Sequence, residues 1–264
     1  MAVSRQTTHE DNYTVQLLEQ LAARGERDAI VSGERRISGR EARDLVLRYA
    51  GALTDLGVSD GDGVALFIVN TPEALLLTLA VHFLGGRLVF VPPEPGNSEL
   101  GSFIERADVG MLIFDRVFAE RAAQLAAETE LPALSLGPVD GAPDFLDQVG
   151  PLTELAPEDV GPASAVVTLF YTGGTTGQPK LVPHRHSFYE RIIKAAGTHG
   201  SSAADPRLLV GTLLSHVSGH FASLMGLFAG QTVVLMAGEG FDAGTAYLLA
   251  QAGQAETSPV GSYA

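Results

Sequence analysis

The sequence predicts an α/β protein with a mostly parallel sheet flanked by helices. The first observation is that short apolar runs of strand length alternate with longer runs of helical periodicity. The second is that residues 64–69 are apolar at every position, which is typical of a strand covered on both faces. The third is size, because 264 residues of which 45% are hydrophobic can bury a full core.

Local signals mark the elements of the first half. Gly33 separates two short β-prone runs, as in a hairpin. Ser38 and Glu41 form a capping box at the start of a helix, and Pro72 stands in the first turn of another. The expected elements are helix 13–24, strands 29–32 and 35–37, helix 38–56, strand 64–69, helix 71–84, strand 88–91, helix 98–107, strand 111–114, helix 118–128 and strand 133–136.

An acidic connection rich in Pro and Gly follows at residues 140–161, and then the alternation resumes. We therefore expect residues 1–160 to form a first α/β subdomain. Residues 161–264 are expected to carry a second, incomplete α/β subdomain. Because the chain stops where a further strand would be due, it is interpreted as an amino-terminal fragment. The expected elements of this half are strand 165–171, helix 187–196, strand 207–214, helix 220–228, strand 232–236 and helix 243–251.

Composition excludes several classes of function. The formal net charge is −14, which argues against a nucleic-acid partner, since neutralising phosphates needs a basic face. There is no cysteine, so disulfides, thiolate metal sites and a cysteine nucleophile are excluded. The most apolar stretch, residues 74–91, is interrupted by His82 and Arg87, whereas a membrane span needs about 20 apolar residues in a row. We expect a cytoplasmic protein with no membrane span.

The strongest motif is the run from Tyr171 to Lys180, which reads Tyr-Thr-Gly-Gly-Thr-Thr-Gly-Gln-Pro-Lys. Its glycines let backbone amides turn inward, its threonines add hydroxyl donors, and Lys180 adds a positive charge. Such a group of donors suits phosphate oxygens. It does not fit the Walker phosphate loop, in which Lys follows a Gly and precedes Ser or Thr. Two alternatives remain open, namely a flexible Gly/Thr turn and a plain surface lysine at position 180.

This run resembles the phosphate-binding signature of the adenylate-forming superfamily, which comprises acyl-CoA synthetases, aryl-acid ligases, luciferases and the adenylation domains of peptide synthetases. The usual form is Tyr-Thr-Ser-Gly-Thr-Thr-Gly-x-Pro-Lys-Gly. Gly173 replaces the Ser and Leu181 replaces the final Gly, a variant similar to aryl-acid ligases. Residues 214–220, Leu-Ser-His-Val-Ser-Gly-His, resemble the segment that borders the acyl pocket in this family.

The resemblance implies ATP-dependent activation of a small-molecule carboxylic acid as an acyl-adenylate. Transfer to the thiol of coenzyme A, or to the phosphopantetheine of an acyl carrier protein, would follow. It implies that Lys180 and His216 are catalytic and that Thr175 helps to coordinate Mg²⁺. The implied ATP-phosphate site consists of Thr172, Gly173, Gly174, Thr175, Thr176, Gly177 and Lys180, and the implied acyl pocket of His216, Val217, Ser218, Gly219 and His220.

The histidines have other interpretations as well. His216 and His220 are four residues apart and on a helix could form a metal pair, but Gly219 separates them and no carboxylate is near. His184 and His186 are expected in a solvated turn or at the rim of the phosphate pocket. His82 lies in an apolar helix and is expected to be a core residue with its polar atoms satisfied.

Several elements of the family are missing from the sequence. These are the Tyr-Gly-x-Thr-Glu segment, the ribose-binding Asp, the hinge, and the mobile carboxy-terminal domain with its adenylation lysine. The chain is therefore expected to be inactive by itself. The alternative function is a non-catalytic nucleotide- or acyl-binding module, that is, a naturally short and degenerate relative.

Overall fold

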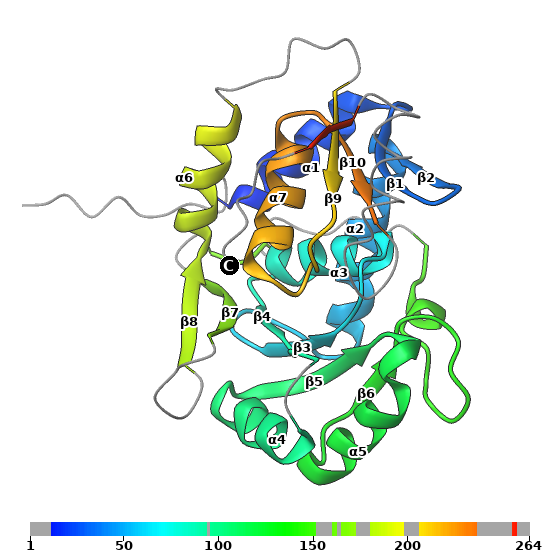
Figure 1. The fold of residues 1–264 in the computed structure, drawn as a ribbon, viewed down its shortest axis with the longest axis vertical. Coiled ribbons are helices and arrows are strands. Elements are labelled where there is room, and N and C mark those ends of the chain that lie inside the picture. The colour runs from blue at the N-terminus through cyan, green and yellow to red at the C-terminus, as the bar shows by residue number, and fades with distance from the viewer. Residues whose placement is uncertain are drawn as a thin grey trace, which may run out of the picture.

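Two β-sheets and the helices around them form the fold (Figure 1). The computed structural model describes residues 12–93, 96–151, 160–162, 165–172, 180–197, 206–236 and 255–257. The larger sheet contains β3 (Gly63–Phe67), β4 (Arg87–Phe90), β5 (Val109–Phe114), β6 (Ala133–Ser135), β7 (Val166–Thr172) and β8 (Lys180–Arg185). The smaller sheet contains β1 (Asp28–Ser32), β2 (Arg35–Ser38), β9 (Arg207–Val210), β10 (Thr232–Leu235) and β11 (Ala255–Thr257).

The strand orders are β6-β5-β3-β4-β7-β8 in the larger sheet and β11-β9-β10-β1-β2 in the smaller one. Neighbouring strands are parallel except at one edge of each sheet, where β7 pairs with β8 and β1 with β2 in antiparallel fashion. The prediction of a mostly parallel α/β fold is confirmed, and so is the hairpin at Gly33.

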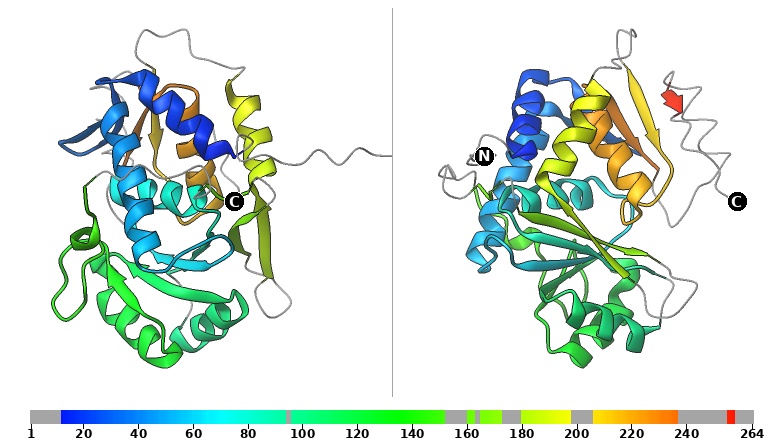
Figure 2. Two further views of the ribbon diagram at one scale, coloured as in Figure 1. Left: turned by 180° about the vertical axis from the view of Figure 1, so that it is seen from behind. Right: turned by 90° about the vertical axis from the view of Figure 1, so that its left-hand side faces the viewer.

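Helices fill the space between the sheets and cover the outer face of the larger one (Figure 2). The helices of the inner layer are α1 (Tyr13–Arg24), α2 (Gly39–Asp55), α3 (Pro72–Phe83) and α7 (Val217–Phe228), with α6 (His186–Gly197) packed against α7. The outer helices are α4 (Asn97–Arg106) and α5 (Ala119–Thr129), and short 3₁₀ turns occur at Arg116–Phe118 and Leu146–Gln148. In the part of the chain that is described, no helix is long and apolar enough to cross a bilayer.

Strand β3 shows why its sequence is apolar throughout. Val64 and Leu66 belong to the core between the sheets, whereas Ala65 and Phe67 belong to a second core with residues of α4 and α5. Successive side chains of a strand point to opposite faces, so a strand with a core on each side has no polar position. The expected burial on both faces is confirmed.

The predicted helix starts are also confirmed. The hydroxyl oxygen of Ser38 accepts a hydrogen bond from the Glu41 amide at 3.2 Å, and Thr71 caps α3 in the same way through the Ala74 amide at 3.2 Å. Each bond satisfies one of the amides that the first helical turn leaves free. Asn12 caps α1.

Both sheets combine strands from the two halves of the chain. Ile30 of β1 is in register with Val233 of β10, and Leu88 of β4 with Thr168 of β7. The expected boundary at residue 160 therefore does not separate the sheets. Strand pairings this far apart in sequence depend on tertiary packing, which local patterns do not record.

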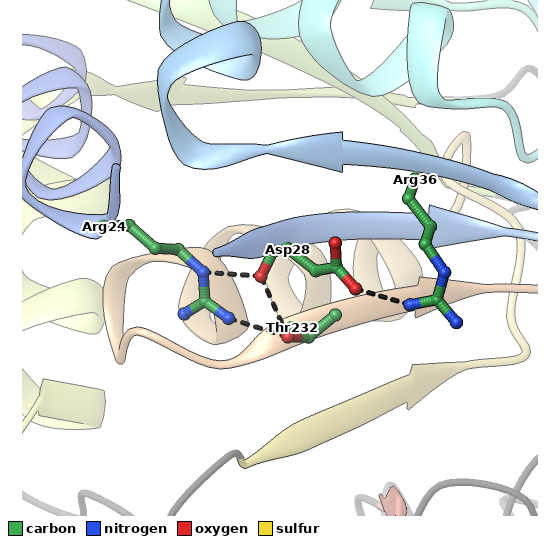
Figure 3. A network of polar contacts seen from close by, with 4 residues as sticks. All are labelled: Arg24, Asp28, Arg36 and Thr232. Atoms are coloured by element: carbon green, nitrogen blue, oxygen red, sulfur yellow. Dashed lines mark hydrogen bonds and ion pairs between the residues drawn. The ribbon is translucent and has the colours of Figure 1, made fainter. Parts of the chain in front are cut away.

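Polar contacts hold the amino-terminal hairpin to β10 (Figure 3). Arg24 is only 7% exposed. It donates from Nε to the Asp28 carbonyl at 2.6 Å and from Nη2 to Thr232 Oγ1 at 2.7 Å. Thr232 donates in turn to the Asp28 carbonyl at 2.9 Å, and Arg36 pairs with the Asp28 carboxylate. The buried guanidinium thus joins α1, β1 and β10 at one point.

The helix expected at 187–196 is confirmed as α6 (His186–Gly197), but the strand β8 that precedes it is not among the expected elements. Two other expectations need correction. The strand expected at 207–214 ends at Val210, and the helix expected at 220–228 begins at Val217. The sequence pattern does not reveal strand β8, because it contains Pro183 and exposed polar residues. Such residues are tolerated at a sheet edge. The helix expected at 243–251 lies outside the described residues.

Candidate functional site

A cavity of about 320 Å³ lies at the carboxyl ends of β4 and β7. Ligands of open α/β sheets bind at this end of the strands. Apolar and aromatic side chains make up most of its wall, and its polar groups come from two histidines, a tyrosine and a serine. The lining residues are Phe90, Pro92, Pro93, Phe170, Tyr171, Val182, His184, Leu213, Ser215, His216 and Val217.

The glycine-rich motif connects two antiparallel strands at the edge of this cavity. Thr172 ends β7, Lys180 begins β8, and the two residues are directly paired. Tyr171, the first residue of the motif, lines the cavity. Residues 173–179 lie outside the described residues, so the roles of Gly173, Gly174, Thr175, Thr176 and Gly177 stay predictions. Tyr171 before the loop and Val182 after it both line the cavity.

The second motif starts helix α7 and contributes residues to the same cavity. His216 is the N-cap residue, and its Nδ1 accepts hydrogen bonds from the Ser218 amide at 3.3 Å and the Ser218 hydroxyl at 2.7 Å. An amide can only donate, so Nδ1 is the unprotonated nitrogen and Nε2 carries the proton. The side chain of Val217 is 40% exposed and lines the cavity next to His216.

Gly219 and Asn70 fix the loop that leads into α7. A Cβ at Gly219 would lie 2.2 Å from the Leu213 carbonyl oxygen, so only glycine fits there. Asn70, which is 2% exposed, donates from Nδ2 to the Thr212 carbonyl at 2.9 Å and accepts from the Leu214 amide at 2.7 Å. One side chain therefore holds the backbone on both sides of Leu213, three residues before His216.

Of the five residues predicted for the acyl pocket, His216 and Val217 line the cavity. Ser218 holds the ring of His216, and Gly219 packs against the preceding loop. His220 lies behind the wall, buried to 1% exposure with its ring 5.3 Å from that of Phe90. The predicted motif thus divides into lining residues and supporting residues.

His220 belongs to a buried hydrogen-bonded chain of side chains. Its Nε2 is bonded to the Tyr189 hydroxyl at 2.8 Å, and that hydroxyl to Thr168 at 2.5 Å. Thr168 is bonded to Nε2 of His82 at 2.9 Å, and Nδ1 of His82 to the hydroxyl of Tyr13. The prediction that His82 is a satisfied core residue is confirmed.

Burial keeps three histidines of the core, His82, His186 and His220, neutral. Desolvation lowers the pKa of His82 well below its usual value, that of His186 to about 4 and that of His220 to about 3. Within the described segments, Nδ1 of His220 and both ring nitrogens of His186 have no hydrogen-bond partner. The charged form has lost its hydration without gaining an acidic partner, which disfavours protonation.

The structure gives no support to a metal pair at positions 216 and 220. His216 is exposed at the start of α7, whereas His220 is buried and bonded to Tyr189. Among the residues with described positions, no three His, Asp or Glu side chains are grouped so that they could hold a metal ion.

His184 and His186 were expected in a solvated turn or at the rim of the phosphate pocket; His186 is instead fully buried at the start of α6, whereas His184 lines the cavity. The place of His184 on a strand was not expected. This residue lies on β8, not in a turn, and its ring packs edge-on against Phe170 with centroids 5.1 Å apart. Val182 and His184 project to the same face of β8, and both line the cavity. Once β8 is known to be a strand, this alternation identifies the pair.

The fold matches the amino-terminal domains of adenylate-forming enzymes. The family model described as "AMP-binding enzyme" matches residues 17–256. The chain therefore belongs to the AMP-binding enzyme family, and the resemblance seen in the sequence is confirmed.

Individual relatives agree with this assignment. A medium/long-chain-fatty-acid–CoA/3-oxocholest-4-en-26-oate–CoA ligase of Mycolicibacterium smegmatis is 30% identical over 80% of this chain and 42% of its own. A 2-succinylbenzoate–CoA ligase of Bacillus licheniformis is 28% identical over the same shares. The structure of the amide bond synthetase McbA from Marinactinospora thermotolerans aligns with a TM-score of 0.77 and 28% identity, covering 92% of this chain and 47% of that one. The chain thus spans less than half the length of these relatives.

Proposed function

We propose that this chain carries the ATP- and acid-binding part of an enzyme that activates a carboxylic acid as an acyl-adenylate. The acyl group would then pass to the thiol of coenzyme A or of a carrier-bound phosphopantetheine. One observation carries the proposal, namely that Tyr171 of the phosphate-loop motif and His216 of the acyl-pocket motif line the same cavity. A carboxylate and the phosphates of a nucleotide must meet in this reaction, and the two motifs meet at this cavity.

The chain's own residues would act by position and charge. In the reaction a carboxylate oxygen bonds to the α-phosphorus of ATP while the bond to pyrophosphate breaks. The amides of the glycine loop and the Lys180 ammonium would hold the phosphates as negative charge builds on the leaving group. His216, which carries its proton on Nε2, can donate that proton in a hydrogen bond to a carboxylate oxygen.

The accessory groups follow from the same proposal. Thr175 would supply a hydroxyl oxygen to Mg²⁺, a cation that prefers oxygen ligands and neutralises charge on phosphates. Coenzyme A or an acyl carrier protein would be the acceptor, and the cytoplasm the compartment. The relatives named as CoA ligases favour coenzyme A.

ATP–pyrophosphate exchange with several carboxylic acids tests the proposal, measured on the protein encoded by the complete reading frame. Lys180→Ala removes a bond to a charged group worth about 1.5–3 kcal/mol, so exchange should fall about ten- to a hundredfold. Thr175→Ala should raise the Mg²⁺ requirement, and His216→Ala should change the preference among acids. Equal losses for all three variants with every acid and Mg²⁺ concentration would refute these separate roles. ATP binding without any exchange would support the non-catalytic binding module instead.

A further inference from the structure

Of the two histidines that line the cavity, one presents a hydrogen-bond acceptor and the other a donor. They come from different elements, His184 from β8 and His216 from the start of α7. The tautomer of each ring follows from a backbone group beside it. A backbone carbonyl can only accept and a backbone amide can only donate, so each identifies which ring nitrogen carries the proton.

His184 presents an acceptor. Its Nδ1 lies 3.2 Å from the carbonyl oxygen of Val182, so Nδ1 must donate and Nε2 is left with a lone pair. Nε2 is at the tip of the ring, away from its own backbone, and no hydrogen bond occupies it among the described residues. Burial lowers the pKa of His184, which keeps this lone pair free of a proton at neutral pH.

The ring of His184 is held in a fixed orientation. It packs edge-on against Phe170, with ring planes at 89°, and against Phe188, with centroids 4.6 Å apart. The Nδ1 bond to Val182 restrains rotation about the remaining torsion. A fixed acceptor in a largely apolar wall discriminates between ligands, because an unpaired polar group in such a place is costly.

The lining of the same cavity includes a group of aromatic and proline residues. Phe90 and Phe170 are tilted by 31° to each other with centroids 5.7 Å apart, and Pro92 and Pro93 complete this group. Aromatic rings pack well against such surfaces. The cavity therefore combines a donor at His216, an acceptor at His184 and an aromatic wall.

We propose that the cavity selects an aromatic carboxylic acid bearing a ring hydroxyl or amino group, and that His184 is the specificity-determining residue that accepts a hydrogen bond from that group. His216 would donate to the carboxylate and the rings of Phe90 and Phe170 would contact the aromatic ring. This inference rests on the proposed function and specifies its substrate class.

Calorimetric binding of acids tests the inference directly. The probes are benzoate, the three monohydroxybenzoates, the matching methoxybenzoates and hexanoate, and ATP binding is measured in parallel. A methoxy group keeps the oxygen and loses the proton. At least one hydroxybenzoate should therefore bind about three- to tenfold more tightly than its methyl ether and than benzoate, the range expected for one neutral hydrogen bond.

Three variants assign this preference to His184. His184→Phe keeps a ring against Phe170 and removes the acceptor, so the ratio of hydroxybenzoate affinity to benzoate affinity should fall to about one. His184→Gln restores an acceptor and should recover part of the preference. Ser187→Ala, at an exposed position of α6 outside the cavity, is the control and should bind like the original protein.

The contradicting outcomes separate this inference from the proposed function. If ATP and benzoate bind but methoxybenzoates equal hydroxybenzoates, or hexanoate binds best, the substrate class is wrong and the proposed function stands. If the preference survives in His184→Phe, another residue sets it. If neither ATP nor any acid binds, both proposals fail.

Discussion

The side chain of Asn70 is expected to control the shape of the cavity from outside it. It forms two hydrogen bonds to the backbone of the loop before His216, one to Thr212 and one from Leu214. Asn70→Ala removes both. Leu214 is 2% exposed, so in the variant its backbone amide has neither water nor a hydrogen-bond acceptor.

The magnitude follows from the number of groups affected. Each buried polar group left unsatisfied costs about 1–3 kcal/mol, and water can reach the Thr212 carbonyl because Thr212 is exposed. Only the Leu214 amide is left unsatisfied, so we expect the free energy of unfolding to fall by about 1–3 kcal/mol. For a chain of this size the midpoint of thermal unfolding should fall by roughly 2–12 °C.

A matched control separates stability from function. Asn12 is fully buried, donates to the Gly161 carbonyl at 3.0 Å and accepts from the Thr14 amide at 2.9 Å, but it does not line the cavity. Asn12→Ala should cost a similar free energy of unfolding. Only Asn70→Ala should also weaken acid binding, by about tenfold, with ATP binding little changed. If both variants weaken acid binding equally in calorimetry, Asn70 has no special role in positioning the loop.

Two further predictions concern neighbouring residues. Gly219→Ala places a Cβ 2.2 Å from the Leu213 oxygen, so the loop must move. The KM for the acid should rise by about tenfold while the KM for ATP stays within twofold, and an unchanged KM for the acid would refute the close approach. His186 and His220 have folded pKa values of about 4 and 3, below the unfolded value of about 6.5. The unfolded state therefore binds more protons between these values, and the stability present above pH 6.5 is lost as the pH falls toward 4 and 3. Urea unfolding at pH 7.5 and pH 5 should show this loss, and His220→Leu should reduce it; an identical pH dependence in the variant would contradict the assignment.

Local chemistry made much of the fold predictable. The caps at Ser38 and Thr71 and the fully apolar β3 depend on residues close in sequence, so their signals are readable in the chain itself. The parallel pairing of β1 with β10 is different, because it joins residues about 200 positions apart. It depends on the buried contacts of Arg24 and Thr232, which no local pattern reveals.

The sequence predicts the site residues that belong to a contiguous motif, but not those that other strands bring to the cavity. His216 and Val217 were found because their motif is contiguous. The strand that carries His184 was not predicted because Pro183 and the charged ends of β8 hide an edge strand, and the position of His184 in the cavity depends on that strand. His220 was grouped with the pocket by its neighbours in sequence, whereas the helical turn directs it to Tyr189 behind the wall.

Binding of an acyl-adenylate mimic tests the central claim that the two motifs serve one cavity. A non-hydrolysable sulfamate that joins a hydroxybenzoyl group to adenosine should bind at least a hundredfold more tightly than AMP or the free acid. It should displace both ligands, and its advantage over AMP should fall in His216→Ala. A mimic that binds no better than AMP, or that leaves the acid bound, would show that nucleotide and acid do not meet at this cavity.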